Sequence, residues 1–216
     1  MSLVEYRIIL KYRLTIPLFP VDEVGHVCRK ACLDKFGKHV VHCRELPGFK
    51  YRHDLVRDVL FDIFKCARVS VKKEAHVNFL TDPLEERSTL RSADVLVYGW
   101  IRERHACVDL SRVSPLVELT TGDFTVGQAA LKAVLSKIVK YERACSKNQD
   151  TFIHFAFDTF GFLALDAMNI LKRVQRVMHS NAWSPKFQDV VFKRSEFAIQ
   201  KRLATQLIVR LPFIKV

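Results

Sequence analysis

The chain has 216 residues, of which 49% are hydrophobic and 27% are charged. This length and apolar content are sufficient to bury a core, so they exclude a disordered tail and predict one folded domain with extensions. The formal net charge of +12 favours a polyanionic partner, and nucleic acid is the obvious candidate. Six scattered cysteines indicate intracellular cysteine usage rather than a disulfide framework.

Residues 1–46 are expected to form an N-terminal strand and a Cys/His cluster. Positions 1–21 are hydrophobic, but four charged residues interrupt the apolar run that a signal peptide needs: Glu5, Arg7, Lys11 and Arg13. The richest apolar stretch elsewhere, 152–168, carries a histidine and two aspartates and falls short of a membrane span. We therefore expect a soluble intracellular protein with no membrane partner.

The Cys/His cluster consists of Cys28, Cys32, His39, His42 and Cys43. Zinc is bound by four thiolate or imidazole ligands, usually delivered as two closely spaced pairs. Cys28, His39 and Cys43 supply three ligands, and Cys32 or His42 could complete a site. The alternative is a degenerate remnant with reduced thiols, and the sequence leaves both interpretations open.

Helix and strand patterns alternate across 47–165, the predicted core. Near-helical spacing of apolar residues predicts a helix over 51–67, and alternation predicts a strand over 68–79. Two further strands, 95–98 and 105–110, are expected on either side of a turn at 99–104. An apolar stripe then predicts a long helix over 125–145, followed by a strand over 152–157.

The last segment, 166–216, is expected to be a basic extension with helices over 166–179 and 195–210. It has ten Lys or Arg residues against three acids. Such a surface contacts phosphates without reading base sequence, and the alternative is a solvated basic face without a ligand. The residues singled out for nucleic-acid binding are Arg91 of the core together with Lys172, Arg173, Arg176, Lys193 and Arg194.

Asp94 and Asp109 each lie within a short apolar run on the two strands that flank the predicted turn. Paired strands would bring both carboxylates to one edge of the sheet. Buried like charges this close repel, so such a pair is held by a metal ion, by a basic side chain, or with one acid protonated. The alternative is that each Asp caps or pairs locally.

The run Leu90-Arg91-Ser92-Ala93-Asp94 is followed after fourteen residues by Asp109 and then by Val113-Ser114-Pro115-Leu116. This pattern is similar to the restriction-endonuclease-like domain, of the PD-(D/E)XK type, at the C-terminal end of some non-LTR retrotransposon proteins. It also resembles a group of plant retroelement-derived reading frames. The family has a Cys/His cluster upstream, as here. The chain differs from the pattern at Ser92, where Pro is usual, and at Gly25, where a zinc ligand is usual.

The resemblance implies an α/β (α+β) fold with a mixed sheet flanked by helices and a small zinc-knuckle-like N-terminal segment. It implies that Asp94 and Asp109 bind Mg²⁺ or Mn²⁺, and that a Lys supports the attacking water and the developing charge. The commonest position for this Lys is Ser111 here, so the family variant with Lys and Tyr on the next helix applies. The matching residues are Lys137, then Lys140, with Tyr141. Glu74 is either a further carboxylate of the metal site or a solvent-facing strand residue.

Three functions follow from these observations. The first is a metal-dependent DNA endonuclease that hydrolyses phosphodiester bonds and acts in the nucleus or elsewhere in the cell. The second is a catalytically inactive module that binds DNA or RNA, a relic of a transposable element. The third is a transposon fossil with no selected activity. The sequence has neither a Gly-x-Ser-x-Gly elbow nor a Gly-rich phosphate loop with a following Lys, so it supports no other hydrolase chemistry.

Overall fold

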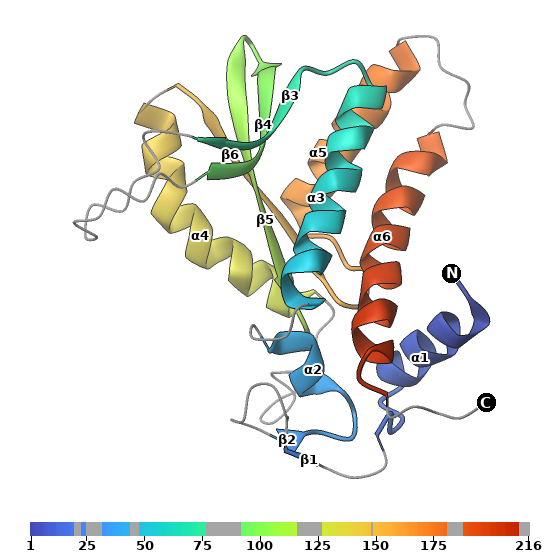
Figure 1. The fold of residues 1–216 in the computed structure, drawn as a ribbon. Coiled ribbons are helices and arrows are strands. Elements are labelled where there is room, and N and C mark those ends of the chain that lie inside the picture. Colours follow the sequence, from blue (N-terminus) through green and yellow to red (C-terminus); the bar gives the residue numbers. More distant parts are fainter. Residues whose placement is uncertain are drawn as a thin grey trace.

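The computed structural model describes residues 1–19, 23–24, 32–43, 48–76, 92–115, 127–147, 149–180 and 188–211. Helices and strands alternate along these residues (Figure 1). The elements are α1 (Leu3–Arg13), β1 (Glu23–Val24), β2 (Cys32–Leu33), α2 (Lys38–His42), α3 (Gly48–Cys66), β3 (Val71–His76), β4 (Ser92–Ile101), β5 (Arg104–Val113), α4 (Gln128–Lys147), β6 (Thr151–Asp158), α5 (Leu165–Ser180) and α6 (Gln188–Ile208).

The central sheet has four strands in the order β3-β4-β5-β6. The pairs β3–β4 and β4–β5 are antiparallel, whereas β5 and β6 are parallel and are joined by α4. A parallel connection needs such a crossover helix because the chain must return to the same end of the sheet. The predicted α/β class with a mixed sheet flanked by helices is therefore confirmed, as is the order of elements from α3 to α5.

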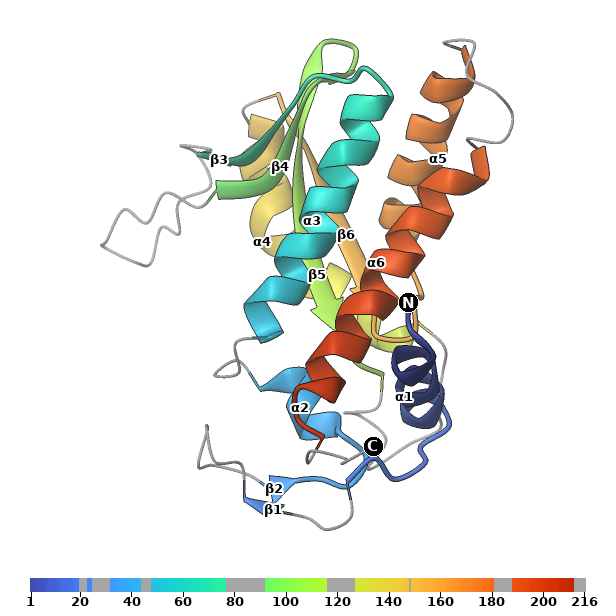
Figure 2. The same ribbon diagram turned by 45° about the vertical axis from the view of Figure 1, so that its right-hand side comes forward.

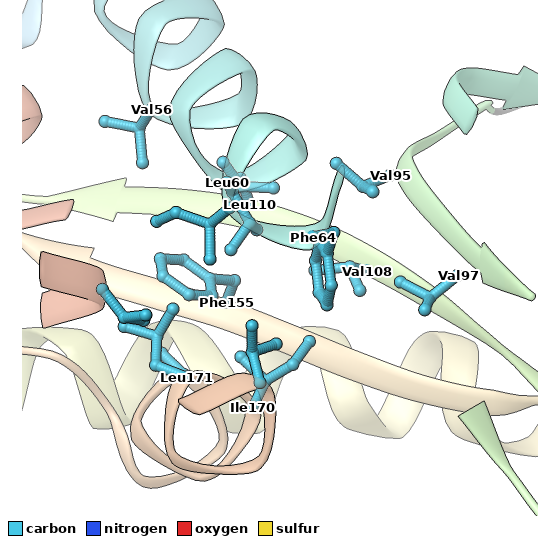
Figure 3. Packing of buried hydrophobic residues seen from close by; sticks show 14 of the residues in the cluster. Val56, Leu60, Phe64, Val95, Val97, Val108, Leu110, Phe155, Ile170 and Leu171 are labelled. Carbon is cyan, nitrogen blue, oxygen red and sulfur yellow. The ribbon is translucent and has the colours of Figure 1, made fainter. Parts of the chain in front are cut away.

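Helix α3 buries one apolar face against the sheet. Val56, Leu60, Ile63 and Phe64 follow helical spacing and are at most 1% exposed. They pack with residues of β4, β5 and β6 and with α5 and α6, and Figure 3 shows part of this cluster. The helix ends in a Schellman motif, in which the amide of Val69 donates to the carbonyl of Phe64 and Arg68 has a φ of 60°.

Helix α4 covers the opposite face of the sheet (Figure 2). Tyr141 and Cys145 of this helix pack with Cys107 of β5, and Ala130 packs with Ala156 of β6. The helix therefore rests on the two parallel strands that it connects. This placement brings the half-buried Lys137 of α4 next to β5, the strand that carries Asp109.

The turn between β4 and β5 lies within the predicted segment 99–104 but is shorter than predicted. Ile101 pairs with Arg104, and the two residues between them, Arg102 and Glu103, have φ of 47° and 68°. This is the φ pattern of a type I′ turn, although neither residue is the usual Gly or Asn. Gly99 instead lies within β4, at a register shift between Val97 and Ile101.

The N-terminal segment is a helix, not the predicted strand. Ser2 and Glu5 form a capping box at the start of α1. Ile8 and Tyr12 are spaced one turn apart and pack against Leu203 and Leu207 of α6. The strand prediction failed because other large apolar residues of α1 are exposed, so its amphipathic pattern is weak in the sequence.

Helices α5 and α6 belong to the core rather than to an extension from it. Ala167, Ile170 and Leu171 of α5, and Ala198 and Ile199 of α6, lie in the same buried cluster as α3 and the sheet. In Figures 1 and 2, both helices lie beside α3. Among the helices that the structure describes, none combines the length and apolar composition needed to cross a bilayer.

Candidate functional site

Asp94 and Asp109 lie at the point where β4 and β5 stop pairing. The last regular pair is Val95 with Val108, and each aspartate is the next residue outward on its strand. Oδ2 of Asp94 accepts a hydrogen bond of 2.6 Å from the amide of Leu110 on β5. The side chain of Asp94 is 19% exposed and that of Asp109 is 26% exposed, so both carboxylates are partly removed from water.

Asp109 is paired with Lys137 of α4. The Nζ atom of Lys137 lies 2.5 Å from Oδ2 of Asp109. Burial raises the pKa of Asp109 above its usual value, and the nearby charge of Asp94 raises it further, while Lys137 opposes both effects. The charge of Lys137 therefore compensates in part for placing two carboxylates close together.

His53 of α3 contacts Asp94 from the opposite face of the sheet. Its Nε2 atom lies 3.2 Å from Oδ2 of Asp94, and its Nδ1 atom lies 3.6 Å from Oδ1 of Asp54. Burial acts to lower the pKa of His53, but the hydrogen bond and charge of Asp94, together with Asp54, outweigh burial, and the pKa is raised. The two carboxylates on either side of the ring therefore favour the imidazolium.

His154 of β6 is the register partner of Asp109 and is fully buried. Its Nε2 atom lies 3.6 Å from Oδ2 of Asp109. Neither ring nitrogen has a hydrogen-bond partner among the residues that the structure describes. Burial lowers the pKa of His154 to about 4, and the charge of Lys137 adds to this effect, so the ring is neutral at pH 7.

The predicted residues of α4 differ in their surroundings. Lys137 reaches Asp109, whereas the side chain of Lys140 lies outside the described part of the structure. Tyr141 is only 8% exposed and packs against Phe152, with ring centroids 5.5 Å apart. Of the predicted Lys and Tyr residues, Lys137 is thus the one seen at the acid pair.

Glu74 lies apart from the acid pair. Its side chain is 64% exposed, and its carboxylate pairs with Arg57 of α3. Arg57 also lies 3.3 Å from Asp54, the residue that faces Nδ1 of His53. Glu74 is therefore linked to Asp94 only through a series of charged side chains on α3.

The predicted zinc ligands are only partly within the described residues. Cys28 lies outside them, as do the side chains of Cys32 and His42. Cys43 is buried among apolar side chains of α1, α2 and α6, and His39 is half-buried. Across the described part of the chain, no three His, Cys, Asp or Glu side chains form a group that could hold a metal ion.

The predicted nucleic-acid contacts fall into two sets. Lys172, Arg176 and Lys193 are exposed, whereas Arg91 lies outside the described residues. Arg173 donates to the carbonyl of Trp100 and lies 4.7 Å from the centroid of its ring. Arg194 lies 4.0 Å from Asp62 of α3. Arg173 and Arg194 therefore stabilise packing between elements in addition to carrying charge.

Sequence reasoning missed His53 and His154. His53 lies 41 residues before Asp94, so no local spacing connects the two. His154 occupies an apolar strand, where a lone histidine is indistinguishable from an ordinary core residue. The available signal was a lone histidine in each predicted element, and that of His154 stands among apolar residues.

The chain was compared with models of protein families and with curated proteins. No family model matches the chain. No curated protein matches it either.

Proposed function

We propose that this protein is a divalent-cation-dependent endonuclease that hydrolyses phosphodiester bonds in DNA. The observation that carries the proposal is the meeting of Asp94, Asp109 and the ammonium group of Lys137 beside the sheet. Two acids and a Lys are the groups that the resemblance to restriction-endonuclease-like domains of retrotransposon proteins implies. The proposed core is accordingly of that type, and a DNA substrate makes the nucleus the proposed location.

The donor set fits Mg²⁺ or Mn²⁺. Mg²⁺ is usually bound by one or two carboxylates and completes its octahedron with waters and substrate phosphates, so a third protein ligand is not needed. Asp94 and Asp109 would be the protein ligands. The burial that raises the pKa of Asp109 also means that a nearby positive charge is stabilising there. For zinc, Cys28, Cys32, His39, His42 and Cys43 stay a prediction.

The side chains have separate parts in the proposed reaction. When bound, a divalent cation polarises a phosphoryl oxygen and stabilises negative charge on it. Lys137 holds a positive charge beside Asp109, where the phosphoryl group gains negative charge as water attacks phosphorus. The neutral ring of His154 adds no competing charge next to Asp109. The exposed Lys172, Arg176 and Lys193 provide contacts for phosphates along the duplex.

The test is nicking of supercoiled plasmid by the purified protein in Mg²⁺ or Mn²⁺. We expect Asp109→Asn to reduce the rate by at least about 100-fold, because one of the two carboxylates proposed to hold the cation is lost. EDTA should abolish nicking. Asp62→Asn, at an exposed aspartate of α3, is the matched control and should retain the wild-type rate.

Nicking that is independent of the metal or of Asp109 would contradict the proposal. Folded protein that binds DNA but does not nick it would instead support the second candidate, an inactive nucleic-acid-binding module. The observation that favours this second candidate is that Glu74 pairs with Arg57, so two carboxylates rather than three face the site in the described residues.

A further inference from the structure

The carboxylate of Asp94 is held by two donors from two different elements. Both hydrogen bonds fall on the same atom, Oδ2, which lies 2.6 Å from the amide nitrogen of Leu110 and 3.2 Å from Nε2 of His53. A carboxylate oxygen only accepts, so His53 is the donor of the second bond. The amide belongs to β5 and the imidazole to α3, so the carboxylate is held both by the neighbouring strand and by a helix that covers the sheet.

Two donors on one oxygen determine which oxygen remains for a ligand. The terminal torsion of an Asp side chain is broad and roughly two-fold, so one hydrogen bond alone leaves the carboxylate free to rotate. Asp109 shows the same arrangement, because the described residues that contact it, Lys137 and His154, both contact its Oδ2 atom. In each acid, these protein contacts therefore involve Oδ2 and not Oδ1.

We propose that His53 is a positioning residue that orients Asp94 so that its Oδ1 atom is presented to a divalent cation shared with Asp109. This inference rests on the proposed function and adds to it a residue outside the acid pair and Lys137. His53 acts through Asp94 because its Nε2 atom is committed to that carboxylate. Its ring is in turn confined by Asp54, 3.6 Å from Nδ1.

The placement of His53 on α3 makes this role effective. Val56 and Leu60 anchor the same helix in the core and are each 1% exposed, so the imidazole extends from a fixed backbone. The side chain of His53 is itself 30% exposed and is not a core residue. Hydrogen-bonding partners of metal ligands typically change metal affinity by about 10–100-fold when they are removed.

The experiment measures Mn²⁺ binding by calorimetry on the full chain without nucleic acid. We expect His53→Leu to weaken Mn²⁺ binding by about 10–100-fold. His53→Gln keeps an N–H donor and should recover most of the affinity. His179→Leu, at an exposed histidine of α5, is the matched control and should bind like the wild type. Thermal unfolding of each variant verifies that it is folded.

A second readout separates positioning from a general structural effect. Nicking by His53→Leu should approach the wild-type rate at saturating Mn²⁺, because only the occupancy of the site is reduced. Equal Mn²⁺ affinity of the wild type and His53→Leu, or equal weakening by His53→Leu and His53→Gln, would overturn the inference and leave the proposed nuclease intact. Absence of Mn²⁺ binding that depends on Asp109 in the wild type would overturn both.

Discussion

The negative charge at Asp109 and its neighbour Asp94 is only partly compensated by the positively charged side chains around them. Two carboxylates, Asp94 and Asp109, lie close enough for each to affect the other, and burial penalises the charged form of Asp109. Lys137 supplies one positive charge at 2.5 Å and the imidazolium form of His53 supplies a second, whereas His154 supplies none because its ring is neutral. Burial still keeps the pKa of Asp109 above its usual value. One further cation beside the acids is therefore electrostatically favourable.

Lys137 is expected to have opposite effects on cleavage and on metal binding. Lys137→Ala should lower the nicking rate by at least about 100-fold, because a charge at the reacting phosphate is lost. The same variant should bind Mn²⁺ at least as tightly as the wild type, because the ammonium competes with a cation for Asp109. The two measurements are plasmid nicking at saturating Mn²⁺ and calorimetry without DNA.

Lys132→Ala is the control for this prediction, since Lys132 is an exposed lysine of the same helix. It should leave both quantities unchanged. If Lys137→Ala weakened Mn²⁺ binding and cleavage to the same extent, Lys137 would be acting on the shape of the site rather than on the reaction.

Asp94 and Asp109 could be predicted as a pair because they lie on two strands that follow each other in the sequence. Lys137 could be predicted because the resemblance implies a Lys on the next helix. His53 and His154 could not, because each meets its partner only through the tertiary fold.

Glu74 is the opposite case, a residue that the sequence suggested for the site and that lies apart from it. Its position on the first strand suggested a site residue. In the structure its backbone φ is 47°, its side chain is exposed, and its carboxylate pairs with Arg57.

At the level of elements, periodicity located most helices and strands but overestimated the length of the β4–β5 turn. The β4–β5 turn was expected over 99–104, but β4 continues to Ile101 and only Arg102 and Glu103 separate the strands, while Gly99 takes its positive φ of 60° within β4. Trp100 was therefore expected in the turn, whereas it is a buried strand residue with its ring 5.7 Å from that of Phe64. The buried side chain of Trp100 accompanies the continuation of β4 past Gly99.

Helix α1 is joined to α6 by an ion pair that should make its attachment depend on pH. The carboxylate of Glu5 lies 2.7 Å from Nζ of Lys201, and this contact, with the amide of Ser2, lowers the pKa of Glu5 from 4.5 to about 2. A lowered pKa in the folded state stabilises the fold above the unfolded pKa, and this stabilisation is lost as the pH falls through the folded pKa. The stabilisation by Glu5 should thus be complete above about pH 4.5 and vanish near pH 2.

The measurement compares the unfolding free energies of wild type and Glu5→Gln across this pH range. The wild type should be the more stable protein at pH 6, and the difference should shrink steadily below pH 4.5. Glu196→Gln, at an exposed acid of α6, controls for the loss of one negative charge. A difference that grew on acidification would show that Glu5 does not act through Lys201.

At the scale of the whole molecule, the sequence predicted the order of the core elements and misjudged the role of its C-terminal part. The composition of 166–216 is basic, and this suggested an extension that binds nucleic acid. The same residues also provide apolar faces that cover the sheet beside α3, as Ile170 and Ile199 show. Composition reports the average of a segment, whereas an amphipathic helix places its charge and its apolar residues on different faces.

The exposed basic face of α5 should bind nucleic acid more strongly than basic residues elsewhere. Lys172 and Arg176 are spaced by four residues, so they share one face of the helix, and both are exposed. The double variant Lys172→Gln/Arg176→Gln should weaken duplex DNA binding and lower the slope of log K against log salt by about 2, because two phosphate contacts are lost. Fluorescence anisotropy across a salt series measures both quantities.

Arg7→Gln/Lys11→Gln is the matched control, because it removes the same charge from exposed positions of α1. If net charge alone attracted DNA, the two double variants would weaken binding equally. If instead the α5 face is the contact, the α1 variant should keep the wild-type salt slope, because its charges meet no phosphate and release no counterions. Equal slopes for the two variants would therefore exclude α5 as a distinct contact surface and leave only a diffuse attraction of the basic protein for a polyanion.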